Sequence, residues 1–248
     1  MLAACGASGD TVICNAAREP EIGDLQNFLC AMGAEVRGAG GSVITVSPGK
    51  ALHGCTHLVI PDRIVTATYL CAAAAAGGDI TLHGADSRHL AAVTTALQQA
   101  GCHLESTADA IRLTSEGRLQ ALSPVRTAPY PGFPTDAQAP LMAAACTGQG
   151  TSLFIETIFE NRFRHAAELA RMGADIRVNG RTALVTGRPL HGARVRSTDL
   201  RGGAALVVAG LAAEGESIVE GITHIDRGYE RLAEKLTALG ADLRRVEA

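Results

Sequence analysis

A short glycine turn that recurs at a spacing of roughly 70 residues is the strongest constraint on how this chain folds. Each copy places a glycine between apolar or small residues, at Gly33, Gly101, Gly173 and Gly240. Glycine is favoured directly after a helix because it adopts a left-handed backbone at little cost. We therefore expect each glycine to end a helix and to lead into a strand.

Residues around these turns predict a repeated unit. Before the first turn, apolar residues follow helical spacing at Leu25, Phe28, Leu29 and Met32. After the turns, short strands are expected at 42–46 and 182–186, with hairpin connections at Gly38–Gly41 and Asn179–Gly180. The pattern indicates an α/β (α+β) fold built from repeated β-α-β-α-β-β units.

The first helix of each unit is apolar nearly all round, as in Ala204–Ala213 and the alanine run Ala72–Ala76. Such a helix is typical of a buried position. A generic α/β array or solenoid is the simpler alternative, but it would expose these helices at its ends. Units packed in threes around an axis would enclose them.

The two parts of the chain are expected to divide near residue 60. A strand is predicted at His57–Ile60, followed by a turn at Pro61. We expect 1–60 to be the remnant of one lobe and 61–248 to form a second lobe of three units. No strand precedes Met1–Ser8, and the last unit stops after one strand near Val246. The repeat is therefore expected to be incomplete at both ends, as in a piece of something larger.

Composition excludes several classes of protein. The chain has 248 residues, 47% of them hydrophobic, and no apolar run approaches the length of about 20 residues that a membrane span needs. It shows no secretory signal, so we expect a soluble, cytoplasmic protein. A net charge of -3 gives no general attraction to nucleic acid. Seven cysteines without a CxxC pair argue against a disulfide framework or a structural zinc site, and most are expected to be buried.

Three arginines lie at predicted strand-to-helix junctions: Arg162, Arg201 and Arg227. The guanidinium group binds phosphate or carboxylate through two parallel hydrogen bonds and stays charged when partly buried. Each arginine alone would more simply form a surface ion pair. Their shared position at junctions favours one common anion site.

Two acidic residues precede predicted helices. Asp136 follows a stretch stiffened by three prolines and stands before an apolar helix. On local sequence alone an N-cap is the better interpretation. Glu19 precedes Pro20 and would serve as an acid interacting with the helix dipole.

No metal or cofactor motif is found. His53 and His57 have HxxxH spacing, but Gly54 between them favours a turn over the helix that such a metal site needs. The sequence has no nucleophile elbow and no phosphate-binding glycine loop. We expect neither a metal site nor a cofactor.

Several segments together resemble one family, the enolpyruvyl transferases, and within it the members that act on UDP-N-acetylglucosamine. In family order, the matching segments are 15–22, 58–68, 126–129, 133–136, 160–163, 171–174, 197–201 and 224–231. They cover essentially the whole chain.

The resemblance implies an inside-out α/β barrel and transfer of the enolpyruvyl group of phosphoenolpyruvate to the sugar 3-hydroxyl, in peptidoglycan synthesis. By position, Asp136 would be the acid/base at the sugar hydroxyl and Glu19 a polar neighbour. Arg162, Arg201 and Arg227 would hold phosphoenolpyruvate or line its cleft, with Arg227 catalytic. Thr135 and Ile158 would contact the uridine-bearing substrate, Ile158 through its backbone.

Some family features are not found. An N-terminal half with a lysine, an arginine and an acid loop cannot be located, and no cysteine here has the sequence context of that loop. Val65 replaces a usual acidic residue, and Tyr130 stands where some members have histidine. Three interpretations stay open: a partial enzyme whose other part, on this or a second chain, completes the site; an inactive remnant that binds a UDP-sugar or a phosphate compound; and a transferase with another acceptor. The isolated chain is expected to be inactive.

Overall fold

The computed structural model describes residues 1–47 and 51–246. Its internal contacts divide the chain into two compact units. The first comprises residues 1–61 with 129–131, and the second comprises residues 62–128 and the chain from 132 onward. The interpretation of these parts as lobes of a larger protein stays a prediction.

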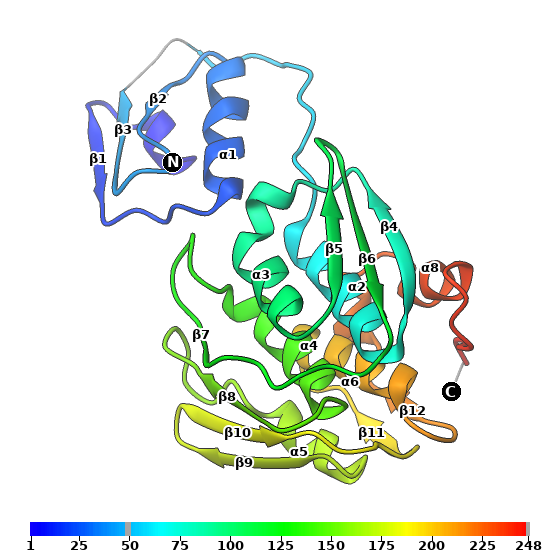
Figure 1. Cartoon of the computed structure of the whole chain (residues 1–248). Coiled ribbons are helices and arrows are strands. Elements are labelled where there is room, and N and C mark those ends of the chain that lie inside the picture. The colour runs from blue at the N-terminus through cyan, green and yellow to red at the C-terminus, as the bar shows by residue number, and fades with distance from the viewer. Residues whose placement is uncertain (48–50, 247–248) are drawn as a thin grey trace. The chain divides into compact units, whose positions relative to one another are not determined.

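The first unit is a three-stranded antiparallel sheet with one α-helix (Figure 1). In chain order its elements are η1 (Ala3–Gly6), β1 (Thr11–Cys14), α1 (Pro20–Ala31), β2 (Glu35–Arg37) and β3 (Val43–Ser47). Strand β3 lies in the middle, and every second side chain along it, at Ile44 and Val46, is buried. The core of this unit is small, with five buried apolar residues: Leu29, Ala34, Val36, Ile44 and Val46.

The four repeated glycines have the backbone that the sequence predicts. Their φ angles are +100° at Gly33, +97° at Gly101, +92° at Gly173 and +98° at Gly240. In each copy the amide after the glycine donates to a carbonyl five residues earlier in the preceding helix, as from Ala34 to Leu29 at 2.9 Å. This is the Schellman pattern of a helix end. The predicted helix ends are confirmed.

Three helices form the interior of the second unit: α2 (Arg63–Ala76), α4 (Thr135–Cys146) and α6 (Leu200–Ala212). They lie side by side and pack against one another (Figure 1). Runs of small residues, such as 71–75 in α2 and 143–145 in α4, are buried along them. Because alanine side chains are short, the helix axes approach closely and leave few voids. The expectation of enclosed alanine-rich helices is confirmed.

Sheets lie outside these helices, which is the inside-out arrangement (Figure 1). The three sheets have the strand orders β4-β6-β5, β7-β8-β10-β9 and β11-β12. Their strands are β4 (Gly78–His83), β5 (His103–Ser106), β6 (Ala110–Ser115), β7 (Val125–Arg126), β8 (Thr151–Ile155), β9 (Asp175–Asn179), β10 (Thr182–Thr186), β11 (Arg194–Arg196) and β12 (Ile218–Glu220). The remaining helices are η2 (Ser87–Leu90), α3 (Ala91–Gln99), α5 (His165–Arg171), α7 (Thr223–Asp226) and α8 (Leu232–Ala238).

The middle copy of the repeat contains every predicted element, in the order β7-α4-β8-α5-β9-β10. Strands β7 and β8 pair in parallel, and helix α4 connects them along the chain. Strands β11 and β12 also pair in parallel, with α6 as their connection. Strands β9 and β10 form the hairpin expected at Asn179–Gly180, where Gly180 has a φ of +57°. The predicted β-α-β-α-β-β unit is confirmed there.

Two predicted strands are wrong. Residues 57–60 form no strand, and Leu58 is 91% exposed, so the apolar run lies in a loop. Near the C-terminus, residues 241–246 likewise form no strand, while 247–248 lie outside the described residues. In both places the apolar pattern was right for a strand, but a strand also needs a neighbour for its backbone hydrogen bonds. No paired neighbour is present in the described part of the chain.

Burial of most cysteines was also expected, and it is true of only three. Cys71, Cys102 and Cys146 are buried, and burial raises the pKa of Cys146 to about 12. Cys14, Cys30 and Cys55 are exposed, and Cys5 is intermediate. Within residues 1–47 and 51–246, no helix has the length and apolar character needed to cross a membrane.

Candidate active site

One carboxylate, that of Asp136, joins two arginines that are distant along the chain. Asp136 lies in the first turn of α4, and its Oδ1 accepts from Nη2 of Arg162 at 2.6 Å. Its Oδ2 accepts from Nε of Arg201, in the first turn of α6, at 3.2 Å. The side chains are 40%, 23% and 13% exposed for Asp136, Arg162 and Arg201, so the cluster is open to solvent on the Asp136 side.

The alternative role of Asp136 as an N-cap is wrong. Pro134 is the N-cap residue of α4, and no side chain caps that helix end. Asp199 is instead the N-cap of α6, where its carboxylate accepts from the amide of Gly202 at 2.8 Å. That cap fixes the turn from which Arg201 projects.

Arg201 rests on a buried tyrosine. Its guanidinium carbon lies 5.4 Å from the ring centroid of Tyr229, whose hydroxyl shares a hydrogen bond of 2.9 Å with Thr68 Oγ1 in α2. Burial alone would lower the pKa of Arg201, but the Tyr229 hydroxyl and the Asp136 carboxylate raise it above its ordinary value. Arg201 therefore stays a cation, and its Nη1 is buried without a hydrogen-bond partner among the described residues.

Arg162 lies in the predicted junction between β8 and α5. Its guanidinium carbon is 5.4 Å from the ring centroid of Phe159, and Asn161 before it has a φ of +53°. His165, three residues later, is 3% exposed. The pKa of His165 is lowered to about 4, mainly by burial. Asp199 opposes this shift, and the Arg162 cation contributes to it. His165 is thus a neutral buried group beside the arginine at neutral pH.

A second carboxylate, Glu156, organises the chain where it leaves β8. Glu156 is 1% exposed and accepts four hydrogen bonds. The donors are Thr127 Oγ1 at 2.9 Å, Thr135 Oγ1 at 2.9 Å, the Ile158 amide at 2.8 Å and the Phe159 amide at 3.1 Å. The two residues singled out for the sugar nucleotide, Thr135 and Ile158, are thus held by the same side chain. Because the Ile158 amide is committed to Glu156, a backbone contact to a ligand would use its carbonyl oxygen.

Arg227 does not join the Asp136 ion pairs. It is exposed at the C-terminal end of α7 and forms no ion pair within the part of the chain that the structure describes. Its segment nevertheless packs beside α6, because Tyr229 lies against Arg201 and an added Cβ at Gly228 would lie 2.9 Å from the Leu200 side chain.

Glu19 lies in the first unit, at the N-cap position of α1. Its side chain makes no capping hydrogen bond. No hydrogen bond therefore supports a role for Glu19 as an ordinary residue at the start of a helix. Its Oε2 is buried without a hydrogen-bond partner in the described ranges. The structure does not position this unit relative to Asp136, so the role of Glu19 stays a prediction.

No metal centre is found. Among the described residues, no group of three or more His, Cys, Asp or Glu side chains has the geometry to hold a metal ion. His57 Nε2 lies 2.9 Å from Asp24 Oδ1, and His53 Nδ1 lies 3.1 Å from the Gly54 carbonyl. Both histidines thus have protein partners.

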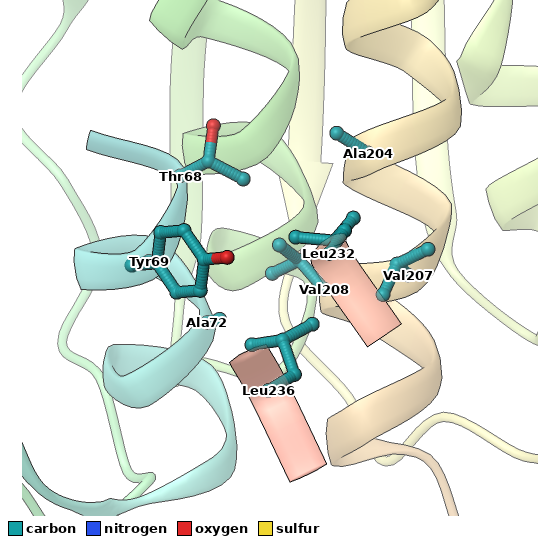
Figure 2. Close-up of a pocket in the computed structure, with 8 residues that line it drawn as sticks. All are labelled: Thr68, Tyr69, Ala72, Ala204, Val207, Val208, Leu232 and Leu236. Carbon is teal, nitrogen blue, oxygen red and sulfur yellow. The ribbon is translucent and has the colours of Figure 1, made fainter. Parts of the chain in front are cut away.

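A small pocket elsewhere in the second unit is part of the core. Figure 2 shows it between α2, α6 and α8, with leucine and valine side chains projecting into it. Its lining residues are Thr68, Tyr69, Ala72, Ala204, Val207, Val208, Leu232 and Leu236. None of the clustered charged residues lines it, so it offers nothing to hold an anion.

The sequence and the fold of this chain match known proteins. The family model for EPSP synthase (3-phosphoshikimate 1-carboxyvinyltransferase) matches residues 1–236. The chain belongs to the EPSP synthase family. Among solved structures similar to this family member is the enolpyruvyl transferase NikO from Streptomyces tendae, with a TM-score of 0.88 at 28% identity. That match covers 100% of this chain and 59% of NikO. EPSP synthase from Acinetobacter baumannii shares the fold, with a TM-score of 0.75 at 21% identity over 99% of this chain and 60% of its own.

Curated members of the EPSP synthase family are more similar in sequence. UDP-N-acetylglucosamine 1-carboxyvinyltransferase 2 from Caldanaerobacter subterraneus subsp. tengcongensis is 51% identical over 247 residues. The UDP-N-acetylglucosamine 1-carboxyvinyltransferases of Zymomonas mobilis and Maricaulis maris are 52% and 54% identical. Each match covers 99% of this chain but only 58 to 59% of the relative. The predicted family and inside-out fold are confirmed.

Three residues of the cluster escaped the sequence reasoning: Glu156, Tyr229 and His165. Glu156 and His165 flank the junction that bears Arg162, and Tyr229 follows Arg227 by two residues. A polar residue directly after a buried strand was the available signal for Glu156. For Tyr229 and His165 the local sequence gave no signal, because their partners lie on other elements or are backbone groups.

Proposed function

We propose that this chain is part of an enzyme that transfers the enolpyruvyl group of phosphoenolpyruvate to the 3-hydroxyl of UDP-N-acetylglucosamine, a step of peptidoglycan synthesis. The observation that carries the proposal is the ion-paired cluster of Asp136, Arg162 and Arg201. Support also comes from the names of the curated relatives, all UDP-N-acetylglucosamine 1-carboxyvinyltransferases.

Charge explains why such a cluster suits this donor. Phosphoenolpyruvate carries a phosphate and a carboxylate, so it needs several fixed cations. Arg201 has a buried, unpartnered Nη1 and a cationic state favoured by Asp136 and Tyr229. In this structure the Asp136 carboxylate itself occupies the two guanidinium groups. An incoming anion would share or take over these donors and free Asp136 to act on the acceptor.

The reaction would proceed by addition and then elimination. The sugar 3-hydroxyl oxygen bonds to C2 of phosphoenolpyruvate while Asp136 accepts the hydroxyl proton, and C3 gains a proton from an acid outside this chain. C3 then loses a proton as the bond from C2 to the phosphate oxygen breaks, and inorganic phosphate leaves. Arg227, exposed and two residues before the Tyr229 that lies against Arg201, would assist in holding the donor. Glu19 would be a polar neighbour of the site.

Phosphate release tests the proposal. The chain alone, mixed with phosphoenolpyruvate and UDP-N-acetylglucosamine, should release no phosphate. Adding a polypeptide with the part of the Zymomonas mobilis relative that this chain does not span should restore release. In that mixture Arg201→Ala should lower kcat/KM by about 10- to 100-fold, because a charge-assisted hydrogen bond contributes about 1.5–3 kcal/mol.

Arg112→Ala is the matched control, because Arg112 forms a similar arginine-carboxylate pair with Asp79 on the β4-β6 sheet. Its kcat/KM should stay within about twofold, as expected for an exposed ion pair. Turnover by the chain alone would refute the partial-enzyme proposal. A mixture that binds UDP-N-acetylglucosamine but never releases phosphate would favour the inactive binding remnant, the second interpretation that the incomplete coverage allows.

A further inference from the structure

We propose that Glu156 is a positioning residue for the sugar nucleotide, a role that rests on the proposed function. Its carboxylate connects two segments that are distant in sequence, the start of α4 and the turn that leaves β8. Thr135 on the first segment precedes Asp136, and Ile158 and Phe159 on the second precede Arg162. One side chain thus sets the spacing between both sides of the cluster.

The burial of Glu156 is costly for folding. It is 1% exposed, and no basic side chain within 1–47 or 51–246 forms an ion pair with it. A buried carboxylate without a cation is destabilising unless its hydrogen bonds are complete, and here four donors satisfy its two oxygens. An apolar residue here would leave these four donors without an acceptor, which is also costly. The four hydrogen bonds therefore offset the cost of burying the charge, and they bring a structural gain as well.

The gain is a fixed backbone. Oε1 accepts from the successive amides of Ile158 and Phe159, which forces a tight turn directly after the strand. Thr127 fixes the same turn from the other side, because its Oγ1 accepts from the Thr157 amide at 2.9 Å and its carbonyl accepts from Thr157 Oγ1 at 2.6 Å.

This turn projects apolar side chains into solvent. Ile158 is 37% exposed and Phe159 is 51% exposed. Exposed apolar groups on a rigid turn, beside a hydroxyl and an arginine, fit a ligand with a flat polar ring and a phosphate chain. A uridine diphosphate sugar has this chemistry.

Two variants separate positioning from mere folding. In Glu156→Gln, the amide oxygen replaces Oε1, and the amide group donates to Thr135, whose hydroxyl can accept. All four hydrogen bonds of Glu156 can therefore still form, although the one with Thr135 reverses its direction. Glu156→Ala removes all four. Ser152→Ala is the matched control, because buried Ser152, on the strand β8 that precedes Glu156, accepts from the Leu122 amide at 2.9 Å.

The test titrates the mixture of this chain and the complementing Zymomonas mobilis polypeptide with UDP-N-acetylglucosamine and, separately, with inorganic phosphate. Amide hydrogen exchange is measured over residues 156–161 of this chain. We expect Glu156→Ala to weaken sugar-nucleotide binding by about tenfold or more and Glu156→Gln by less than about threefold. Phosphate binding at the arginines should change less than about twofold in both. Exchange over 156–161 should accelerate in Glu156→Ala alone.

Three outcomes would overturn the inference. Wild-type affinity in Glu156→Ala removes the positioning role and leaves the proposed function intact. A loss of affinity in Ser152→Ala equal to that in Glu156→Ala assigns the effect to lost stability. Absence of sugar-nucleotide binding by the wild-type mixture, with accelerated exchange in Glu156→Ala, would remove the proposed function, and Glu156 would then have no sugar nucleotide to position.

Discussion

Asp136 shows what local sequence cannot predict about a single residue. Local sequence favoured a helix cap, because an acidic residue before an apolar helix is a good capping residue. The structure gives the carboxylate two cations, 26 and 65 positions later in the chain. Pairings over such separations depend on how α4, α6 and the segment between β8 and α5 pack. The family resemblance pointed to Asp136, Arg162 and Arg201, and packing brings these three together.

His165 gives a pH prediction at the residue scale. Its folded-state pKa is lowered by burial to about 4, below the usual value of 6.5. The unfolded chain therefore binds a proton as the pH falls from about 6.5 to 4, whereas the folded chain does not, so stability falls across this window. From pH 7 to pH 4, wild type should lose about 2 to 3 kcal/mol more than His165→Gln. Urea unfolding at several pH values measures this loss.

Surface histidine variants provide the control. His103 is 70% exposed, so His103→Gln should keep the wild-type pH dependence. A pH dependence of His165→Gln that matches wild type would mean that the imidazole is not held neutral in the folded chain.

At the scale of the element, helix α6 contains one glycine that has no room for a side chain and another that has room for a methyl group. A Cβ on Gly203 would lie 2.2 Å from Ser197 Oγ and 2.7 Å from Ile225 Cγ1. Gly203→Ala should therefore destabilise the chain by about 1 to 3 kcal/mol, as overpacking does. The midpoint of urea unfolding should fall with little change in slope.

Gly210→Ala in the same helix is the matched variant. Its Cβ would meet the Ser217 Cβ at 3.4 Å, an ordinary contact. Because glycine is a poor helix former, this change should stabilise the chain by about 0.5 to 1 kcal/mol. Equal effects of the two substitutions would contradict the close approach of Ser197 and Ile225 to Gly203.

Elements were predictable where a local cause determines them. The glycine turns, the hairpin at Gly180 and the buried alanine helices follow from backbone preference and periodicity. The strand expected at 57–60 failed because pairing is not encoded in one segment, and Leu58 is exposed instead. The same limit explains why only part of the candidate site could be predicted from the sequence. Arg162 and Arg201 were singled out by residue type and position, but the contacts of Glu156 and Tyr229 are with partners on other elements.

At the scale of the molecule, the two units have very different cores. The first buries five apolar residues, whereas the second has one continuous core that includes α2, α4 and α6. Small domains bury too little surface to be very stable alone. The units should therefore unfold separately in urea, the first at the lower concentration.

Two matched leucines test this expectation. Leu29 is 1% exposed in the first unit, and Leu113 is 0% exposed in the second. Each substitution by alanine should cost about 2 to 5 kcal/mol. Hydrogen exchange of peptides from each unit, measured across a urea series, should show that Leu29→Ala shifts only peptides within 1–47, whereas Leu113→Ala shifts only those of the second unit. A single transition that both substitutions move equally would show that the chain folds as one cooperative body, and the first unit would then derive its stability from the second.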